Sequence, residues 1–272
     1  TMLGGKVSAL YGGGRAVSGT ARLTGEIDVA VLGGTVTENV FGGGANRGGD
    51  TDAPVEGNIS VRVGGSANAG YVYGGGGSTT KNGVTGSMTV TVDGDAVVKS
   101  VYGSGNGARC VGTTQVTVTG RASVQNVYGG GGNGGTVILG GDPDTVSKRV
   151  AVSGSAVVSG EVRGGGSSGS PAGSEITIQD SARVGSVSSL TESSAKVTIS
   201  GGATVGIEAD NKGISVSARA PIPFAIGAPL TGAVYVLLEG VPTEGAAIAT
   251  GAAQADLAHV KLLNGGGWGL LW

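Results

Sequence analysis

Five aromatic side chains recur at one position of a repeating pattern, and they are the best candidates in this chain for binding a ligand. They are Tyr11, Phe41, Tyr73, Tyr102 and Tyr128, and each is followed by glycine. Exposed along one edge, such a row of rings could grip a glycan through the apolar faces of its sugars. Buried, the same rings would stack and stabilise neighbouring parts of the chain, and the sequence leaves both possibilities open.

Other residues that could perform chemistry stand alone. Cys110 is the only cysteine, and no histidine or basic cluster beside it would lower its pKa, so we interpret it as an inert thiol. His259 is the only histidine and lacks a serine or cysteine partner in a recognisable order, so we expect it to be a structural residue. The glycine runs do not precede a Gly-Lys-Ser/Thr segment, which argues against a phosphate loop.

Two pairs of aspartates lie in glycine-rich loops, where they could hold a calcium ion. The pairs are Asp50 with Asp52 and Asp142 with Asp144. The Gly-Asp repeat of calcium-binding β-rolls is absent, so we interpret these side chains as solvated loop carboxylates. We therefore expect no catalytic residues, no metal site and no cofactor.

The aromatic residues belong to a repeat with the pattern V-x-V-x-G-x-A-x-V-x-x-V-Y-G-G-G. It reads EIDVAVLGGTVTENVFGGG from Glu26 and NISVRVGGSANAGYVYGGG from Asn58. Arg163 and Ser188 stand at the aromatic position in later copies, and successive copies are 25 to 35 residues apart. Because the length changes fall after the glycines, the repeat predicts a constant wall followed by a variable loop.

Apolar and polar residues alternate in the first part of each copy, as in Ile27, Val29 and Val31. Alternation of β-branched residues predicts strands. One copy cannot bury its own valines, whereas equivalent strands stacked about 4.8 Å apart would close a tube around them. We predict an all-β fold, namely a right-handed parallel β-helix of about seven coils. The length of this stack of coils would be roughly 35 Å. The period is too short for the four strands of a β-propeller blade.

The outward positions of the first strand form two predicted rows, along which an enzyme of this fold could carry its carboxylates. One row is Ala30, Arg62, Thr91, Thr117, Ala151, Thr177 and Thr198, and the other is Asp28, Ser60, Thr89, Gln115, Arg149, Glu175 and Lys196. Carboxylates do not adjoin in either row, so no acid–base pair is evident there. A carbohydrate-active β-helix enzyme with its site in the loops remains the alternative.

The pattern changes near residue 214, so we divide the chain into a parallel β-helix domain, residues 1–213, and a C-terminal β-rich capping module, residues 214–272. The second segment holds both tryptophans and most of the prolines. The open end of a solenoid needs cover against pairing with other chains, which is the role we expect for this module.

Charge and hydropathy limit the partners. The net charge of −2 provides no basic field for a phosphate backbone, so we expect no nucleic-acid partner. Apolar stretches fall short of the roughly 20 residues that span a bilayer, so we expect no membrane insertion of this segment.

The V-Y-G-G-G copies, with V-x-V-x-G-x-A-x-V between them, resemble the Gly-rich right-handed β-helical repeats of large bacterial cell-surface and adhesin-like proteins. The resemblance covers about residues 6–207. The tail, with IATG at Ile248–Gly251 and KLLN at Lys261–Asn264, is similar to modules that end such repeat regions. The resemblance implies a secreted or cell-surface protein with a structural or adhesive role, whose partner is a glycan or a host-surface protein.

Overall fold

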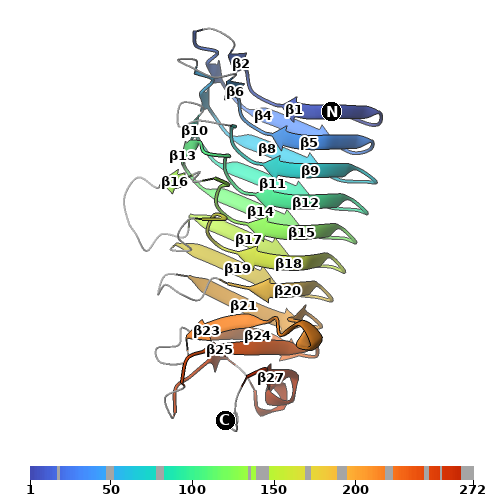
Figure 1. Ribbon diagram of the computed structural model, residues 1–272, viewed down its shortest axis with the longest axis vertical. Coiled ribbons are helices and arrows are strands. Elements are labelled where there is room, and N and C mark those ends of the chain that lie inside the picture. Colours follow the sequence, from blue (N-terminus) through green and yellow to red (C-terminus); the bar gives the residue numbers. More distant parts are fainter. Residues whose placement is uncertain are drawn as a thin grey trace.

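The chain winds into a stack of coils made of parallel strands, as the computed structural model shows (Figure 1). The stack has about seven turns and almost no helix, which confirms the predicted all-β parallel solenoid. The residues that the structure describes are 1–16, 19–46, 52–77, 83–133, 136–138, 147–168, 173–188, 195–217, 223–241, 245–251 and 253–264.

Three parallel sheets form the walls of the solenoid, and we number them in the order in which a central coil passes through them. Sheet 1 has nine strands, β4 (Ile27–Val31), β8 (Ile59–Val63), β11 (Met88–Val92), β14 (Thr114–Val118), β17 (Lys148–Val152), β19 (Ser174–Ile178), β21 (Lys196–Gly201), β24 (Phe224–Leu230) and β26 (Ala249–Thr250). Sheet 2 has eleven, β1 (Lys6–Tyr11), β5 (Thr35–Phe41), β9 (Asn68–Tyr73), β12 (Val97–Tyr102), β15 (Ser123–Tyr128), β18 (Val157–Arg163), β20 (Arg183–Val187), β22 (Thr204–Val205), β23 (Ile214–Ser217), β25 (Val234–Glu239) and β27 (Val260–Leu262).

Sheet 3 is narrower, because each coil gives it only two or three residues. Its five described strands are β3 (Leu23–Thr24), β7 (Val55–Glu56), β10 (Val84–Thr85), β13 (Arg109–Val111) and β16 (Thr136–Ile138). Two short strands, β2 (Arg15–Ala16) and β6 (Ala45–Asn46), pair separately. The two 3-10 helices of the described chain are Glu208–Asp210 and Gln254–His259.

Sheet 1 stacks each residue on its equivalent in the next coil. Val61 pairs with Val90 and Val63 with Val92, and all four side chains are buried. The two outward rows predicted from the repeat pair in the same way along the sheet, which confirms the predicted alternation. The valines therefore form continuous inward ladders, and the free energy of their burial holds adjacent coils together.

A residue in the left-handed backbone conformation turns the chain from sheet 1 to sheet 2. Gly94 and Gly120 occupy this position with φ of 66° and 70°, a conformation that glycine adopts without steric cost. In one later coil Asp180 takes the same conformation, and its carboxylate accepts a hydrogen bond of 2.9 Å from the Gly154 backbone N–H. A buried alanine follows the turn in most coils, as at Ala96 and Ala122.

The first glycine of each V-Y-G-G-G corner packs against backbone. A Cβ atom at Gly74 would lie 2.2 Å from the Gly103 carbonyl oxygen, and one at Gly42 would lie 2.4 Å from the Gly74 oxygen. The backbone ladder continues through this corner, since the Gly74 N–H donates to the Tyr102 carbonyl at 3.0 Å. Close approach of neighbouring coils therefore requires the glycines.

Sheet 3 lies in the segment that the repeat predicts as a variable loop. Val84 of this segment pairs with Val55 and with Cys110, and all three side chains are buried in the main core. The sequence pattern missed this wall because each coil contributes so few residues to it. In each of the first five coils, the aromatic residue of the repeat ends the sheet 2 strand.

The strands after residue 213 extend the existing sheets. β24 pairs with β21 of sheet 1, and β25 pairs with β23 and β22 of sheet 2. Side chains bond to the backbone of these last strands: the buried Asp256 carboxylate accepts from the Leu230 N–H at 2.7 Å, and the Asn264 amide bonds both the N–H and the C=O of Leu238. Such bonds saturate strand edges, as expected of a cap, although the boundary at residue 213 stays a prediction.

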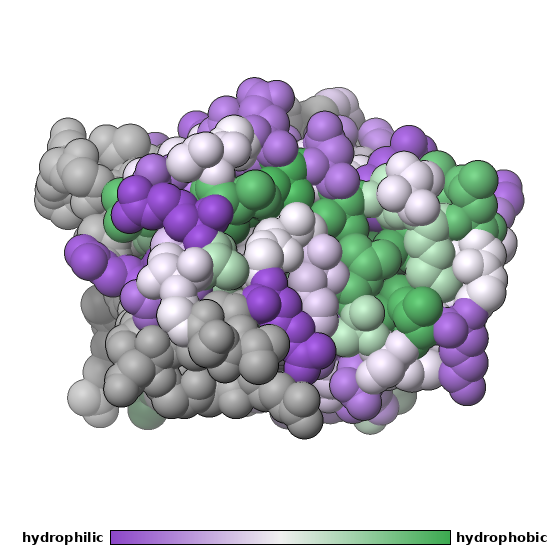
Figure 2. Space-filling model, turned by 90° about the horizontal axis from the view of Figure 1, so that it is seen from above, coloured by the Kyte–Doolittle hydropathy of each residue, from purple (hydrophilic) through white to green (hydrophobic). Residues whose placement is uncertain are grey.

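The end of the stack at which β1 lies shows apolar side chains flanked by polar ones (Figure 2). Leu3 and Val7 are exposed there, by 76% and 39%. The equivalent of Val7 in the next coil, Val36, is 1% exposed. Burial of each coil's apolar ladder thus depends on the presence of the coil beyond it.

We predict that Gly74→Ala lowers the free energy of unfolding by about 1–3 kcal/mol, because the new methyl group must push two coils apart. Urea unfolding followed by circular dichroism measures the change. Gly4→Ala is the control, since a Cβ there meets nothing within 4 Å, and its effect should stay below about 0.5 kcal/mol. Equal stability of the two variants would contradict the close packing of the corner.

Candidate functional site

The five predicted aromatic residues come together at the ends of the first five strands of sheet 2. Successive rings are in register, from Tyr11 with Phe41 to Tyr102 with Tyr128. The residue before each ring, such as Val72 or Val101, points into the main core, so the ring points away from it. The sequence pattern therefore predicts this row of rings correctly.

The rings stack face to face in one column. Their centroids are 5.3, 4.8, 4.7 and 4.9 Å apart from Tyr11 to Tyr128, and successive planes differ by 9° to 15°. This spacing is that of neighbouring strands, about 4.8 Å, so backbone pairing alone brings the faces into contact. We call this column the aromatic spine.

The middle of the aromatic spine is buried. Phe41 and Tyr73 are 5% exposed and Tyr102 is 9% exposed. Glycines cover them: a Cβ at Gly77 would lie 2.9 Å from the Phe41 ring, and one at Gly132 would lie 3.2 Å from the Tyr73 ring. The ring faces are thus occupied by one another, and the column forms a small second core outside the main one.

Ligand binding by the spine stays a prediction, and it applies best to the half-buried rings at the two ends, Tyr11 and Tyr128. Beyond Tyr128 the column is continued by Arg163, which pairs with it in register. Glu161 is partly buried nearby, and its carboxylate accepts a hydrogen bond from the Ser188 hydroxyl. Burial raises the pKa of Glu161, and the charge of Arg163 partly offsets this.

Burial also raises the pKa values of tyrosine hydroxyls in the spine. Removal from water raises the pKa of Tyr73 far above its ordinary value, and the neighbouring Tyr102 and Tyr71 add to the effect. The pKa values of Tyr102 and Tyr128 are raised by burial as well. The phenols of Tyr73, Tyr102 and Tyr128 therefore stay neutral, as expected for rings whose role is packing.

A second aromatic feature lies beside the spine, and the sequence pattern did not reveal it. The Lys99 ammonium group lies 4.9 Å from the centroid of the Tyr71 ring. This contact raises the pKa of Lys99, first through a hydrogen bond with the Tyr71 hydroxyl. Tyr71 and Lys99 belong to adjacent copies, but only the register between β9 and β12 brings them together.

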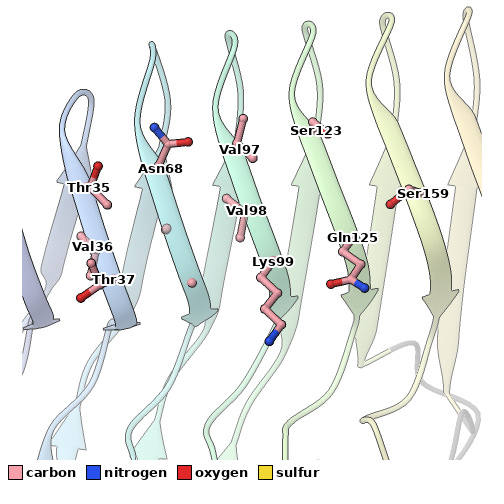
Figure 3. A pocket seen from close by; sticks show the side chains of 12 residues that line it. Thr35, Val36, Thr37, Asn68, Val97, Val98, Lys99, Ser123, Gln125 and Ser159 are labelled. Carbon is pink, nitrogen blue, oxygen red and sulfur yellow. The ribbon is translucent and has the colours of Figure 1, made fainter.

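Next to this pair, a groove with a volume of about 510 Å³ runs over the outer face of sheet 2 (Figure 3). It crosses β5, β9, β12, β15 and β18. Its lining residues are Thr35, Val36, Thr37, Asn68, Ala69, Gly70, Val97, Val98, Lys99, Ser123, Gln125 and Ser159. Among these residues Lys99 alone is charged, so hydroxyl and amide groups dominate the polar part of the groove.

Ion pairs join neighbouring coils on the outer face of sheet 1 and at the turn that follows it. Arg62 donates to Asp93 at 2.7 Å, and Arg149 lies 3.4 Å from Glu175. Arg121 binds both carboxylate oxygens of Asp95, at 2.7 and 2.8 Å. These pairs are exposed, and pairs of this kind contribute about 0–1 kcal/mol each, so we interpret them as a solvated surface.

The other candidate residues from the sequence are the single cysteine, the single histidine and the loop aspartates, and three of these aspartates lie outside the described residues. Cys110 is buried in the core, and burial raises its pKa, which suits an inert thiol. His259 ends the 3-10 helix Gln254–His259. Of the four loop aspartates, Asp50, Asp142 and Asp144 fall outside the described residues. Within the described part of the chain, no group of three or more His, Cys, Asp or Glu side chains could hold a metal ion.

The fold and the surface define the class of protein as a parallel β-solenoid with a groove on one wall. Comparison with family models, with curated proteins and with solved structures gives no match. Among the described residues, no helix is long and apolar enough to cross a membrane.

We predict that Tyr73→Ala lowers the free energy of unfolding by about 3–5 kcal/mol, because it opens a cavity between two stacked rings. Tyr73→Phe is the matched control and should change it by less than about 1 kcal/mol, since Phe41 fills the same position in the preceding coil. Chemical unfolding of both variants provides the measurement. A fully stable Tyr73→Ala protein would show that the spine does not support the fold.

Alkaline pH should destabilise the protein through the same phenols. Because their folded pKa values are raised, the stability that they contribute is fully present below about pH 10 and is lost as the pH rises toward the folded values. Unfolding midpoints measured from neutral to alkaline pH test this. The double variant Tyr73→Phe, Tyr102→Phe should lose stability less steeply than the parent, and identical slopes would contradict the assignment.

Proposed function

We propose that this chain is a non-enzymatic structural and adhesive segment of a bacterial cell-surface protein, with its contacts to a glycan or a host-surface protein on the outside of the solenoid. The aromatic spine is the observation that carries the proposal. It runs unbroken through five coils, and its middle rings are covered by glycine. Residues that could have formed a binding platform instead tie one coil to the next.

The arrangement of the backbone supports the same structural role. Parallel ladders, valine rows and stacked rings all join neighbouring coils along one axis, so the molecule is supported along its whole length. The outer face of sheet 1 carries no such constraint, and its residues vary from coil to coil, as the row from Asp28 to Lys196 shows. A stiff support with a variable exterior suits a spacer that presents binding surfaces.

The location at the cell surface rests on the resemblance of the V-Y-G-G-G repeats to those of adhesin-like proteins. The alternative, a carbohydrate-active enzyme with carboxylates in the loops, stays a prediction. Within the described residues no feature favours it, and Asp50, Asp142 and Asp144 lie outside them.

Antibodies against this chain should label intact cells of the source bacterium, and protease treatment of those cells should remove the signal. The purified chain should bind in a screen of glycans and host-surface proteins without releasing reducing ends from any polysaccharide. Labelling only after permeabilisation would contradict the surface assignment. Release of reducing ends would instead establish the enzyme.

A further inference from the structure

The groove on sheet 2 has the shape of a site for an extended chain. Five consecutive coils contribute to it, and it follows the direction in which the coils stack (Figure 3). A compact small molecule would contact only one or two of these coils. A linear polymer could contact all of them.

The lining repeats once in each coil. Thr35, Asn68, Val97 and Ser123 form one row in register across β5, β9, β12 and β15. Adjacent members of such a row are about 4.8 Å apart, close to the length of one pyranose residue in an extended polysaccharide. Hydroxyl and amide groups are the usual partners of sugar hydroxyls, so Thr35, Asn68 and Ser123 can bind sugar hydroxyls. Val97 offers apolar contact to a ring face.

The middle of the groove presents exposed apolar surface. Gly70 lines it without a side chain, because the Glu38 carbonyl oxygen lies 2.3 Å from where a Cβ would be. Val97 in the next coil is 50% exposed. The face of a sugar ring is apolar and can pack on such a surface.

One positive charge stands beside this apolar surface. Lys99 lines the groove and is held beside Tyr71 by the cation–π contact of 4.9 Å. The described lining contains no carboxylate that would neutralise it. A ligand with a negative charge at this point gains a charge-assisted hydrogen bond.

Other linear polymers fit less well. β9 and β12 are paired on both sides along the groove, so a peptide would find no strand edge to extend. A single-stranded nucleic acid would stack its bases on exposed aromatic rings, and the described lining contains no aromatic residue.

We propose that this groove binds an extended anionic polysaccharide, with a sugar carboxylate at Lys99 and sugar rings over Gly70 and Val97. The inference rests on the proposed adhesive function and names its surface and its class of ligand.

Titration calorimetry with hexagalacturonate at low ionic strength tests the proposal. The parent chain should bind, and Lys99→Gln should weaken binding about tenfold through loss of one charge-assisted contact. The methyl-esterified hexasaccharide should bind the parent about as weakly as the free acid binds Lys99→Gln. Lys196→Gln, which removes an exposed cation from the outer face of sheet 1, is the matched control and should keep the parent affinity.

Each other outcome overturns the proposal in a recognisable way. Absence of hexagalacturonate binding, or equal affinities of the parent and Lys99→Gln, would exclude the groove, and a different ligand found in the glycan screen would then leave the adhesive function standing. Equally tight binding of poly-L-glutamate would show a response to charge without recognition of sugar. Thermal unfolding of every variant confirms that the compared proteins are equally folded.

Discussion

Parallel pairing of one coil on the next places equivalent residues about 4.8 Å apart, and every other feature of this molecule must be compatible with that spacing. A residue inside the stack has a near copy of itself above and below. Valine tolerates this neighbour well, as the pairs of Val61 with Val90 and Val63 with Val92 show. Where the backbones themselves meet, at Gly74 and Gly103, even a methyl group has no room.

The same spacing explains why aromatic rings recur at one position of the repeat. Flat rings at strand separation lie face to face, and the measured centroid distances of 4.7 to 5.3 Å are those of favourable stacking. The spine forms a second small core on the outer side of sheet 2. It stabilises coils whose main core is narrow, because most of the main core consists of valine and alanine.

Away from the spine, the exterior is free of this constraint, and function can vary there. A groove along the coil axis offers the same kind of contact several times, with local differences such as Gly70 or Lys99. β-Bulges shift the register of sheet 2 after Val36 and after Val124, close to the groove. A scaffold of this type can change its ligand through outward residues while its inward ladders stay the same.

Repeat logic predicts the features that recur in every coil. The alternation at Ile27, Val29 and Val31 predicts sheet 1, and the recurrence of an aromatic before glycine predicts that Tyr11 and its equivalents form a row. Prediction from the repeat fails where a strand is short or its sequence pattern is irregular. Sheet 3 has two or three residues per coil, so Val55, Val84 and Cys110 look like loop residues in the sequence.

The sequence by itself determined the all-β solenoid, its inward ladders and its column of rings, because a local pattern repeated in each coil specifies all three. Only the tertiary structure decided that the rings are buried, that Lys99 lies on Tyr71 and that a groove crosses five coils. The physical reason is that burial and contact depend on register between coils and on what covers a side chain. Alternation shows that a ring and the valine before it point in opposite directions, and the structure shows that glycines then cover the ring.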